Sequence, residues 1–170
     1  GQYDTYTPIQ LSQYISTIAN GGTRYQPHLL KEVHASRETE ELGEVIYTFE
    51  PNALNTVNTK PEYLNRVKEG FHAVTTASYG LGRDYIDASH DPSGKTGTSQ
   101  SFTDADKDGI IDTPTVSTAF IGYAPSTNPQ MSITVTSPDS SIENPNNSFS
   151  SLVTKRITKK ASDAYFARYP

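Results

Sequence analysis

The protein is a chain of 170 residues, the length of one ordinary domain, with a hydrophobic fraction of 34% and a formal net charge of -5 at pH 7. No apolar run is long enough to cross a membrane, and the acidic balance lacks the basic footprint of nucleic-acid-binding domains, so we expect no nucleic-acid partner. The absence of cysteine excludes disulfides, thiolate metal sites and a cysteine nucleophile.

Residues 8–19 carry the sequence pattern of a helix with one apolar face. Thr7 and Gln10 have the spacing of a capping box, and Pro8 stands at the first helical position, where its missing N–H costs nothing. The Asn-Gly-Gly sequence at 20–22 favours the left-handed turn that ends a helix. The apolar positions recur every three or four residues and comprise Leu11, Tyr14, Ile15, Ile18 and Ala19.

The middle of the chain predicts a hairpin, a second helix and a loop. Two runs of strand-like composition, 23–34 and 44–49, flank a polar and charge-rich stretch, 35–43, which is typical of a hairpin with a solvated loop. Apolar residues at helical spacing predict a helix over about 61–75. Residues 79–92 are rich in Gly, Asp, Ser and Pro, and we expect a loop there.

The last third of the chain predicts an antiparallel meander of three strands, about 93–102, 116–124 and 130–137, followed by a helix over about 148–168. Apolar and polar side chains alternate in the second and third strands, as they do when the two faces of a sheet meet different environments. We therefore expect an α+β fold in which helices pack on an antiparallel sheet. The last helix should lie across one face of the sheet through a stripe of Phe149, Leu152, Val153, Ile157, Ala161, Ala164 and Tyr165.

The stretch 93–99, Ser-Gly-Lys-Thr-Gly-Thr-Ser, is the most informative for chemistry. It is small and polar where a strand usually carries bulky apolar side chains, and Gly97 lets another backbone approach closely. Lys95 supplies a cation, Thr96 and Thr98 supply hydroxyls, and the strand's own N–H groups can donate hydrogen bonds. Groups of this kind bind a carboxylate or a developing oxyanion. The alternative interpretation is an ordinary solvent-facing edge strand.

Residues 95–98 resemble the third signature motif of penicillin-binding proteins and serine β-lactamases. The stretches 1–22, 24–29 and 118–130 are similar, in the same order, to regions of class B, monofunctional penicillin-binding proteins. The resemblance covers nearly the whole chain and implies the penicillin-binding-protein and serine β-lactamase-like transpeptidase fold. It also implies a serine-type D,D-transpeptidase that cross-links peptidoglycan on the outer side of the bacterial cell membrane, where a segment N-terminal to this chain anchors it.

In that family a serine attacks stem peptides that end in D-Ala-D-Ala, and β-lactam antibiotics acylate the same serine. Carried over to this sequence, the resemblance makes Lys95 and Thr98 the catalytic residues: Lys95 keeps the proton network poised, and the N–H of Thr98 donates to the oxyanion. The hydroxyls of Thr96 and Thr98 hold the substrate carboxylate. The substrate-binding strand comprises Thr96, Gly97, Thr98 and Ser99.

The sequence departs from the family pattern in its nucleophile. No serine is followed three residues later by lysine, and the S-x-N match at 126–128 comes after the lysine motif, in a predicted turn. We therefore expect residues 1–170 to be the C-terminal segment of one transpeptidase domain, whose nucleophile-bearing part lies upstream and is its partner. The chain alone should be inactive. Alternatives within the fold are a D,D-carboxypeptidase and a relative that hydrolyses or senses β-lactams.

Residues 104–112 match the first nine positions of a calcium-binding loop, with oxygen ligands at alternate positions and glycine at the sixth. Position twelve is Thr115 instead of the usual glutamate. The loop is either a calcium site or a solvated acidic turn, and a non-catalytic binding module with this loop is a further alternative for the chain. We expect no other cofactor, since the four histidines lack metal-ligand spacing. The calcium ligands would be Asp104, Asp106, Asp108 and Asp112.

Overall fold

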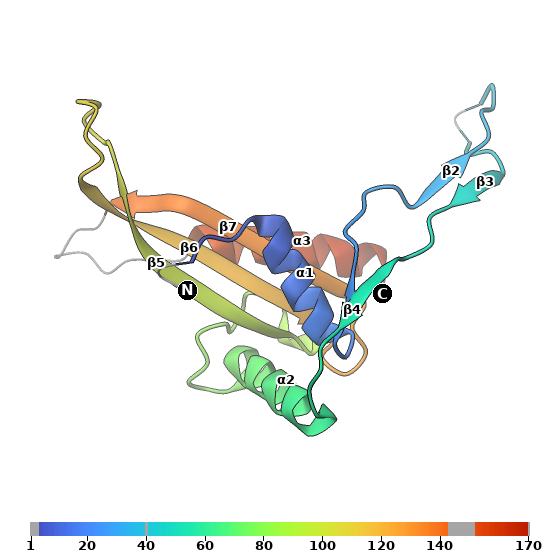
Figure 1. The fold of residues 1–170 in the computed structure, drawn as a ribbon, viewed down its shortest axis with the longest axis horizontal. Coiled ribbons are helices and arrows are strands. Elements are labelled where there is room, and N and C mark those ends of the chain that lie inside the picture. Colours follow the sequence, from blue (N-terminus) through green and yellow to red (C-terminus); the bar gives the residue numbers. More distant parts are fainter. Residues whose placement is uncertain (1–3, 40, 143–151, 170) are drawn as a thin grey trace.

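A computed structural model describes residues 4–39, 41–142 and 152–169 (Figure 1). Its helices are α1 (Pro8–Ala19), α2 (Pro61–Thr76) and α3 (Leu152–Arg168), with a 3-10 helix at Ala88–His90. Its strands are β1 (Thr23–Tyr25), β2 (Glu32–His34), β3 (Val45–Thr48), β4 (Ala53–Thr56), β5 (Ser93–Thr103), β6 (Thr113–Ala124) and β7 (Met131–Ile142). The main sheet is antiparallel in the order β5-β6-β7, and β1 pairs with β4 and β2 with β3 in two small sheets. The predicted α+β fold is confirmed.

Side chains along β6 point alternately to the two faces of the main sheet, and each face contacts different helices. Ile121 and Tyr123 pack with α1 and α2, whereas Phe120 packs with α3. The helices α1 and α3 therefore cover opposite faces of the sheet, and Figure 1 shows α1 in front of the strands and α3 behind them. Pairing of β5 with β6 runs without a break from Ser93 opposite Tyr123 to the hairpin end, so these strands are longer than predicted.

Each face of the sheet has its own apolar core, because side chains on a strand point alternately to one face and to the other. The two cores share the strands between them. The core beneath α1 comprises Ile15, Ile18, Ala19 and Tyr123. The core beneath α3 comprises Tyr85, Ile86, Phe120, Ala124 and Phe166.

The first helix begins and ends as its sequence predicts. The Thr7 hydroxyl accepts a hydrogen bond of 3.3 Å from the N–H of Gln10, and the Gln10 side chain accepts one of 2.8 Å from the N–H of Thr7. These two bonds complete the capping box. At the other end Gly21 has a φ of 90° and Gly22 a φ of 108°, values that favour glycine. Local residues alone therefore set both limits of α1.

The predicted hairpin of 23–34 with 44–49 is wrong in part. β2 does pair with β3, but β1 pairs with β4, a strand that the sequence analysis did not predict. All four residues of β4 are exposed, so no apolar alternation marks it in the sequence. Its pairing is supported by a side-chain contact, because the Arg24 guanidinium donates to the Asn55 amide oxygen at 3.1 Å. Figure 1 shows the β2–β3 hairpin projecting away from the main sheet.

The last helix lies across the sheet as predicted, but through a different face. The predicted stripe is wrong at Val153 and Ile157, which are 46% and 49% exposed, and right at Tyr165, which packs against the core that contains Phe120. Phe149 lies outside the described residues. None of the described helices combines the length and apolarity of a membrane span. The residues of α3 that are buried are Thr154, Thr158, Ser162 and Phe166.

Candidate active site

The predicted site residues lie on an edge strand of the main sheet. Within the described part of the chain, β5 pairs only with β6, so its other edge is open to an extended ligand. Lys95, Gly97 and Thr98 are exposed, and Thr96 and Ser99 are half-buried. The structure therefore brings the five predicted residues together on one accessible strand.

The cation and the hydroxyls leave β5 toward different faces of the sheet. Lys95 is paired with Ile121, on the face that packs with α1 and α2, whereas Thr96 is paired with Phe120, on the α3 face. Thr98 lies on the same face as Thr96, two residues along. A ligand that runs along the open edge of β5 is therefore within reach of both kinds of group. The Lys95 ammonium donates to the Thr96 carbonyl oxygen at 2.7 Å.

Gly97 is not required by its neighbours in this chain. A Cβ atom at Gly97 would meet Ala119 at 3.5 Å, an ordinary van der Waals distance, and Gly97 has no positive φ. The absence of a side chain leaves space above the strand that the described residues do not fill. That Gly97 admits another backbone from outside stays a prediction.

A cavity of about 290 Å³ adjoins the start of the motif, between α2 and β5. Its walls include Ala73 and Val74 of α2, and Lys95 and Thr96 of β5. Leu81, in the loop before β5, also lines it and is 81% exposed. The cavity therefore offers an apolar wall beside Lys95, which the resemblance makes a catalytic residue.

Two hydrogen bonds hold α2 against the segment that enters β5. The Thr75 hydroxyl donates to the Pro92 carbonyl oxygen at 2.5 Å, and His72 Nε2 lies 2.9 Å from an Asp91 carboxylate oxygen. The sequence analysis did not single out these contacts, because they join residues that are distant in the sequence. They anchor the segment directly before Lys95.

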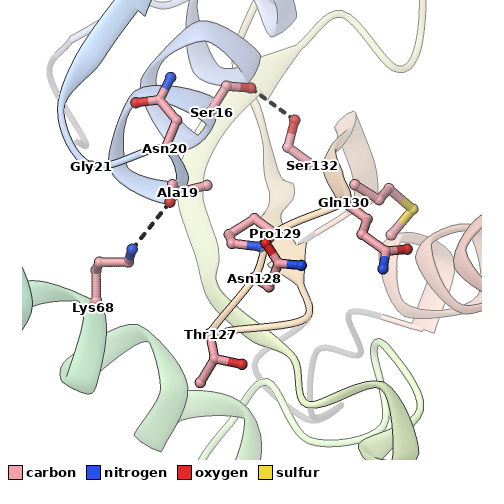
Figure 2. Close-up of a pocket in the computed structure, with 11 residues that line it drawn as sticks. Ser16, Ala19, Asn20, Gly21, Lys68, Thr127, Asn128, Pro129, Gln130 and Ser132 are labelled. Carbon is pink, nitrogen blue, oxygen red and sulfur yellow. Dashed lines mark hydrogen bonds between the residues drawn. The ribbon is translucent and has the colours of Figure 1, made fainter.

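A larger cavity of about 500 Å³ lies between the C-terminal end of α1, α2 and the β6–β7 turn (Figure 2). Lys68 donates to the Ala19 carbonyl oxygen at 3.1 Å, and the Ser16 and Ser132 hydroxyls are 2.8 Å apart. The S-x-N match at 126–128 lies in this turn, as predicted. None of the residues 95–99 lines this cavity, so the motif strand and the larger cavity are separate features.

The acidic loop forms the tip of the β5–β6 hairpin. Carboxylate oxygens of Asp104, Asp106 and Asp108 lie within 4.8 Å of one another, and Asp112 is not in this group. The Asp104 carboxylate accepts hydrogen bonds from the N–H groups of Asp108 and Gly109, at 3.1 and 2.9 Å. Eight residues of strand separate Lys95 from Thr103, roughly 26 Å. The loop is thus remote from Lys95, and calcium binding stays a prediction.

Three of the histidines take part in ring stacking or hydrogen bonding. His28 stacks on Phe49 with ring centroids 3.9 Å apart, and His90 stacks on Phe166 at 4.0 Å. The carbonyl oxygen of Gly43 and the Glu32 carboxylate both accept from the ring of His34, which raises the pKa of that histidine. None of the three lies in a group of metal-binding side chains within the described ranges.

Comparison with known proteins gives matches over most of the chain. Residues 1–163 match the family model described as the penicillin binding protein transpeptidase domain. Penicillin-binding protein 2A of Bacillus subtilis is 42% identical over 98% of this chain. The peptidoglycan D,D-transpeptidase MrdA of Haemophilus influenzae is 30% identical over 78% of it.

The fold agrees with these matches. A solved structure of penicillin-binding protein 2B from Streptococcus pneumoniae covers 100% of this chain with a TM-score of 0.77 and 31% identity. The chain spans only part of its relatives: 23% of the Bacillus subtilis protein, 20% of MrdA and 26% of the solved chain. The similarity therefore covers most or all of this chain and about a fifth to a quarter of each relative.

Proposed function

The chain belongs to the penicillin-binding protein transpeptidase domain family and has class B relatives, and from this premise we propose that it supplies the substrate-binding strand of a serine D,D-transpeptidase that cross-links peptidoglycan. The observation that carries the proposal is the position of residues 95–98, Lys-Thr-Gly-Thr, on an accessible edge strand.

Each residue of this strand has a role in the proposed reaction. Lys95 places a positive charge beside the reacting serine and keeps the proton network poised, and the N–H of Thr98 donates to the oxyanion. The hydroxyls of Thr96 and Thr98 hold the terminal carboxylate of the donor stem peptide, or the carboxylate of a β-lactam. Gly97 and Ser99 complete the strand against which the donor peptide lies.

The reaction proceeds in two acyl transfers. The serine oxygen attacks the carbonyl carbon of the penultimate D-Ala, its proton passes to a base, and the terminal D-Ala leaves as a protonated amine. An amine of a neighbouring stem peptide then attacks the ester and releases the serine. A β-lactam opens on the same serine and leaves it acylated, because its leaving amine stays tethered.

We place the nucleophile in a part of the polypeptide upstream of residue 1. No serine of this chain is followed three residues later by lysine, and the relatives are about four times as long. Residues 1–170 are then the C-terminal segment of the catalytic domain and are inactive alone. The full protein works on the outer side of the cell membrane, held by an N-terminal anchor.

Covalent labelling of the full-length protein by a fluorescent penicillin tests the proposal. We expect the wild type to be labelled, and Lys95→Ala and Thr98→Ala to lower the second-order labelling rate by about tenfold or more, since each removes a group that stabilises charge in the transition state. Lys160→Ala, a matched change at an exposed position of α3, should label at the wild-type rate. Labelling of Lys95→Ala at the wild-type rate would sink the site assignment.

Product analysis separates the transpeptidase from its alternatives. With a D-Ala-D-Ala peptide and an added amine acceptor, a transpeptidase forms the new amide, whereas a D,D-carboxypeptidase forms only the hydrolysed peptide. Hydrolysed penicillin as the main product would indicate a β-lactamase instead.

A further inference from the structure

An aromatic ring lies directly against the strand that carries the motif. Gly94 of β5 and Gly122 of β6 are paired across the sheet, on the α3 face. A Cβ atom at Gly94 would be 2.5 Å from Phe120 Cζ, and one at Gly122 would be 2.7 Å from Phe120 Cε1. The ring of Phe120 therefore lies over both glycines and occupies the space that their side chains would take.

The ring has no room to retreat. Its outer side stacks on Tyr85 with ring centroids 4.4 Å apart and an interplanar angle of 17°. Phe120 is 0% exposed and Tyr85 is 2% exposed, and the Lys155 ammonium of α3 lies 6.0 Å from the centre of the Tyr85 ring. Phe120 is therefore held between the sheet backbone on one side and Tyr85 on the other.

Neither glycine owes its identity to backbone conformation, because neither has a positive φ. The requirement at Gly94 is one of contact: the backbone of β5 touches the ring and has no space for one more carbon. Gly97 differs, since a Cβ there meets nothing closer than 3.5 Å. Gly94 therefore fixes β5 to the core that contains Phe120, whereas Gly97 leaves the strand open to a ligand.

We propose that the stack of Tyr85 and Phe120 on Gly94 is a positioning device for the proposed catalytic strand. The inference rests on the proposed function. An edge strand is held by hydrogen bonds on one side only, so packing against its faces sets its position perpendicular to the plane of the sheet. Lys95 directly follows Gly94, and Thr96 is paired with Phe120 itself. A displacement at the ring therefore passes at once to the residues that act on substrate.

Substitution of Gly94 in the full-length protein tests the device. Gly94→Ala should push β5 away from the ring and lower the acylation rate constant of the bound fluorescent penicillin by about tenfold or more, because catalysis tolerates little misplacement. Non-covalent affinity should change less. Phe120→Leu removes the ring contact, although an added carbon at Gly94 would still lie 2.8 Å from the Ile121 carbonyl oxygen. The double variant Gly94→Ala with Phe120→Leu should therefore acylate faster than Gly94→Ala alone and more slowly than Phe120→Leu alone.

The control is a variant of equal stability loss in the other core. Ile18→Ala removes buried methyl groups beneath α1 and should lower the melting temperature with the acylation rate unchanged. The proposed positioning role would be overturned if Gly94→Ala acylates at the wild-type rate, or if the double variant is as slow as Gly94→Ala. If Gly94→Ala does not fold, Phe120→Leu decides, because acylation as fast as that of Ile18→Ala contradicts the inference.

These outcomes are distinct from a failure of the proposed function. If the wild-type protein is not labelled by penicillin, or if Lys95→Ala is labelled at the wild-type rate, the site assignment fails before the positioning test begins. If Lys95→Ala is slow and Gly94→Ala is not, the site stands and only the positioning device is wrong.

Discussion

Asp139 lies in β7 with a φ of 45°, a left-handed conformation that asparagine and aspartate tolerate better than most residues. Its carboxylate accepts hydrogen bonds of 2.6 Å from the hydroxyls of Ser101 and Thr115, on the other two strands of the main sheet. These bonds favour the charged form, so the Ser101 and Thr115 hydroxyls lower the pKa of Asp139 below its ordinary value of 3.8. One carboxylate thus links all three strands far from Lys95.

The lowered pKa of Asp139 predicts a pH-dependent contribution to stability. The unfolded chain binds a proton at Asp139 at a higher pH than the folded chain does, so the stabilisation is present above the ordinary pKa and is lost as the pH falls through the folded pKa. Asp139→Asn should lower the free energy of unfolding at pH 7 and should lower it by less at pH 3. Thermal unfolding of both proteins between pH 3 and 7 measures the difference, and parallel curves would contradict the assignment.

Among the elements, α3 shows how a helix with two distinct faces is oriented. Its apolar stripe, which includes Val153 and Ile157, faces away from the main sheet, and a stripe of small hydroxyl residues faces it. Burying hydroxyls costs free energy unless they are hydrogen-bonded. The Ser162 hydroxyl donates to the Lys159 carbonyl oxygen at 2.9 Å, whereas the buried Thr158 hydroxyl has no hydrogen-bond partner among the described residues. Packing shape, and not hydrophobicity alone, therefore decides which face of α3 meets the sheet.

The unpartnered hydroxyl of Thr158 predicts a stabilising substitution. Thr158→Val keeps the shape and the β-branch of the side chain and removes the buried polar group, so we expect the free energy of unfolding to rise by about 1 kcal/mol. Thermal or denaturant unfolding of the full-length protein measures the change. Ser162→Ala is the matched control on the same face and should bring no gain, since its hydroxyl is paired. A loss of stability in Thr158→Val would show that the hydroxyl has a partner outside the described residues.

At the scale of the whole molecule, the chain has two apolar cores and also exposes large apolar side chains on several elements. Val153 and Ile157 on α3, Ile46 on β3 and Leu81 before β5 are between 46% and 81% exposed. The relatives are about four times as long as this chain. The exposed apolar surface agrees with our proposal that further chain completes the domain, because burial of such surface is the main favourable term in folding.

The exposed apolar surface predicts how residues 1–170 behave when they are produced alone. We expect strong binding of a hydrophobic dye such as ANS and a broad thermal transition, whereas the full-length protein should bind little dye and unfold cooperatively. Dye fluorescence and calorimetry measure both. Changing Val153 and Ile157 together to Ser should reduce dye binding by the fragment. A sharp transition without dye binding would mean that the fragment is a complete domain.

Features set by residues close together in the sequence were predictable. The capping box of Thr7 and Gln10, the alternation of β6 and β7, and the motif at 95–98 all follow from local spacing. The alternation also predicts the meander of strands, whereas the open edge of β5 is known from the structure. The assignment of Lys95 and Thr98 to catalysis came from resemblance and stays a proposal.

Only the tertiary structure decided the pairings between distant residues. β1 pairs with β4, a pairing of backbones that needs no apolar pattern in the sequence. Small hydroxyl residues of α3 face the sheet, where Phe120 and its neighbours form the apolar core. The contact of Phe120 with Gly94 has the same origin, since the two residues are distant in the sequence and adjacent in the sheet. By itself the sequence determined the elements and the chemical groups on the motif strand. The fold determined how firmly that strand is held, because packing depends on the shapes of residues that meet only after folding.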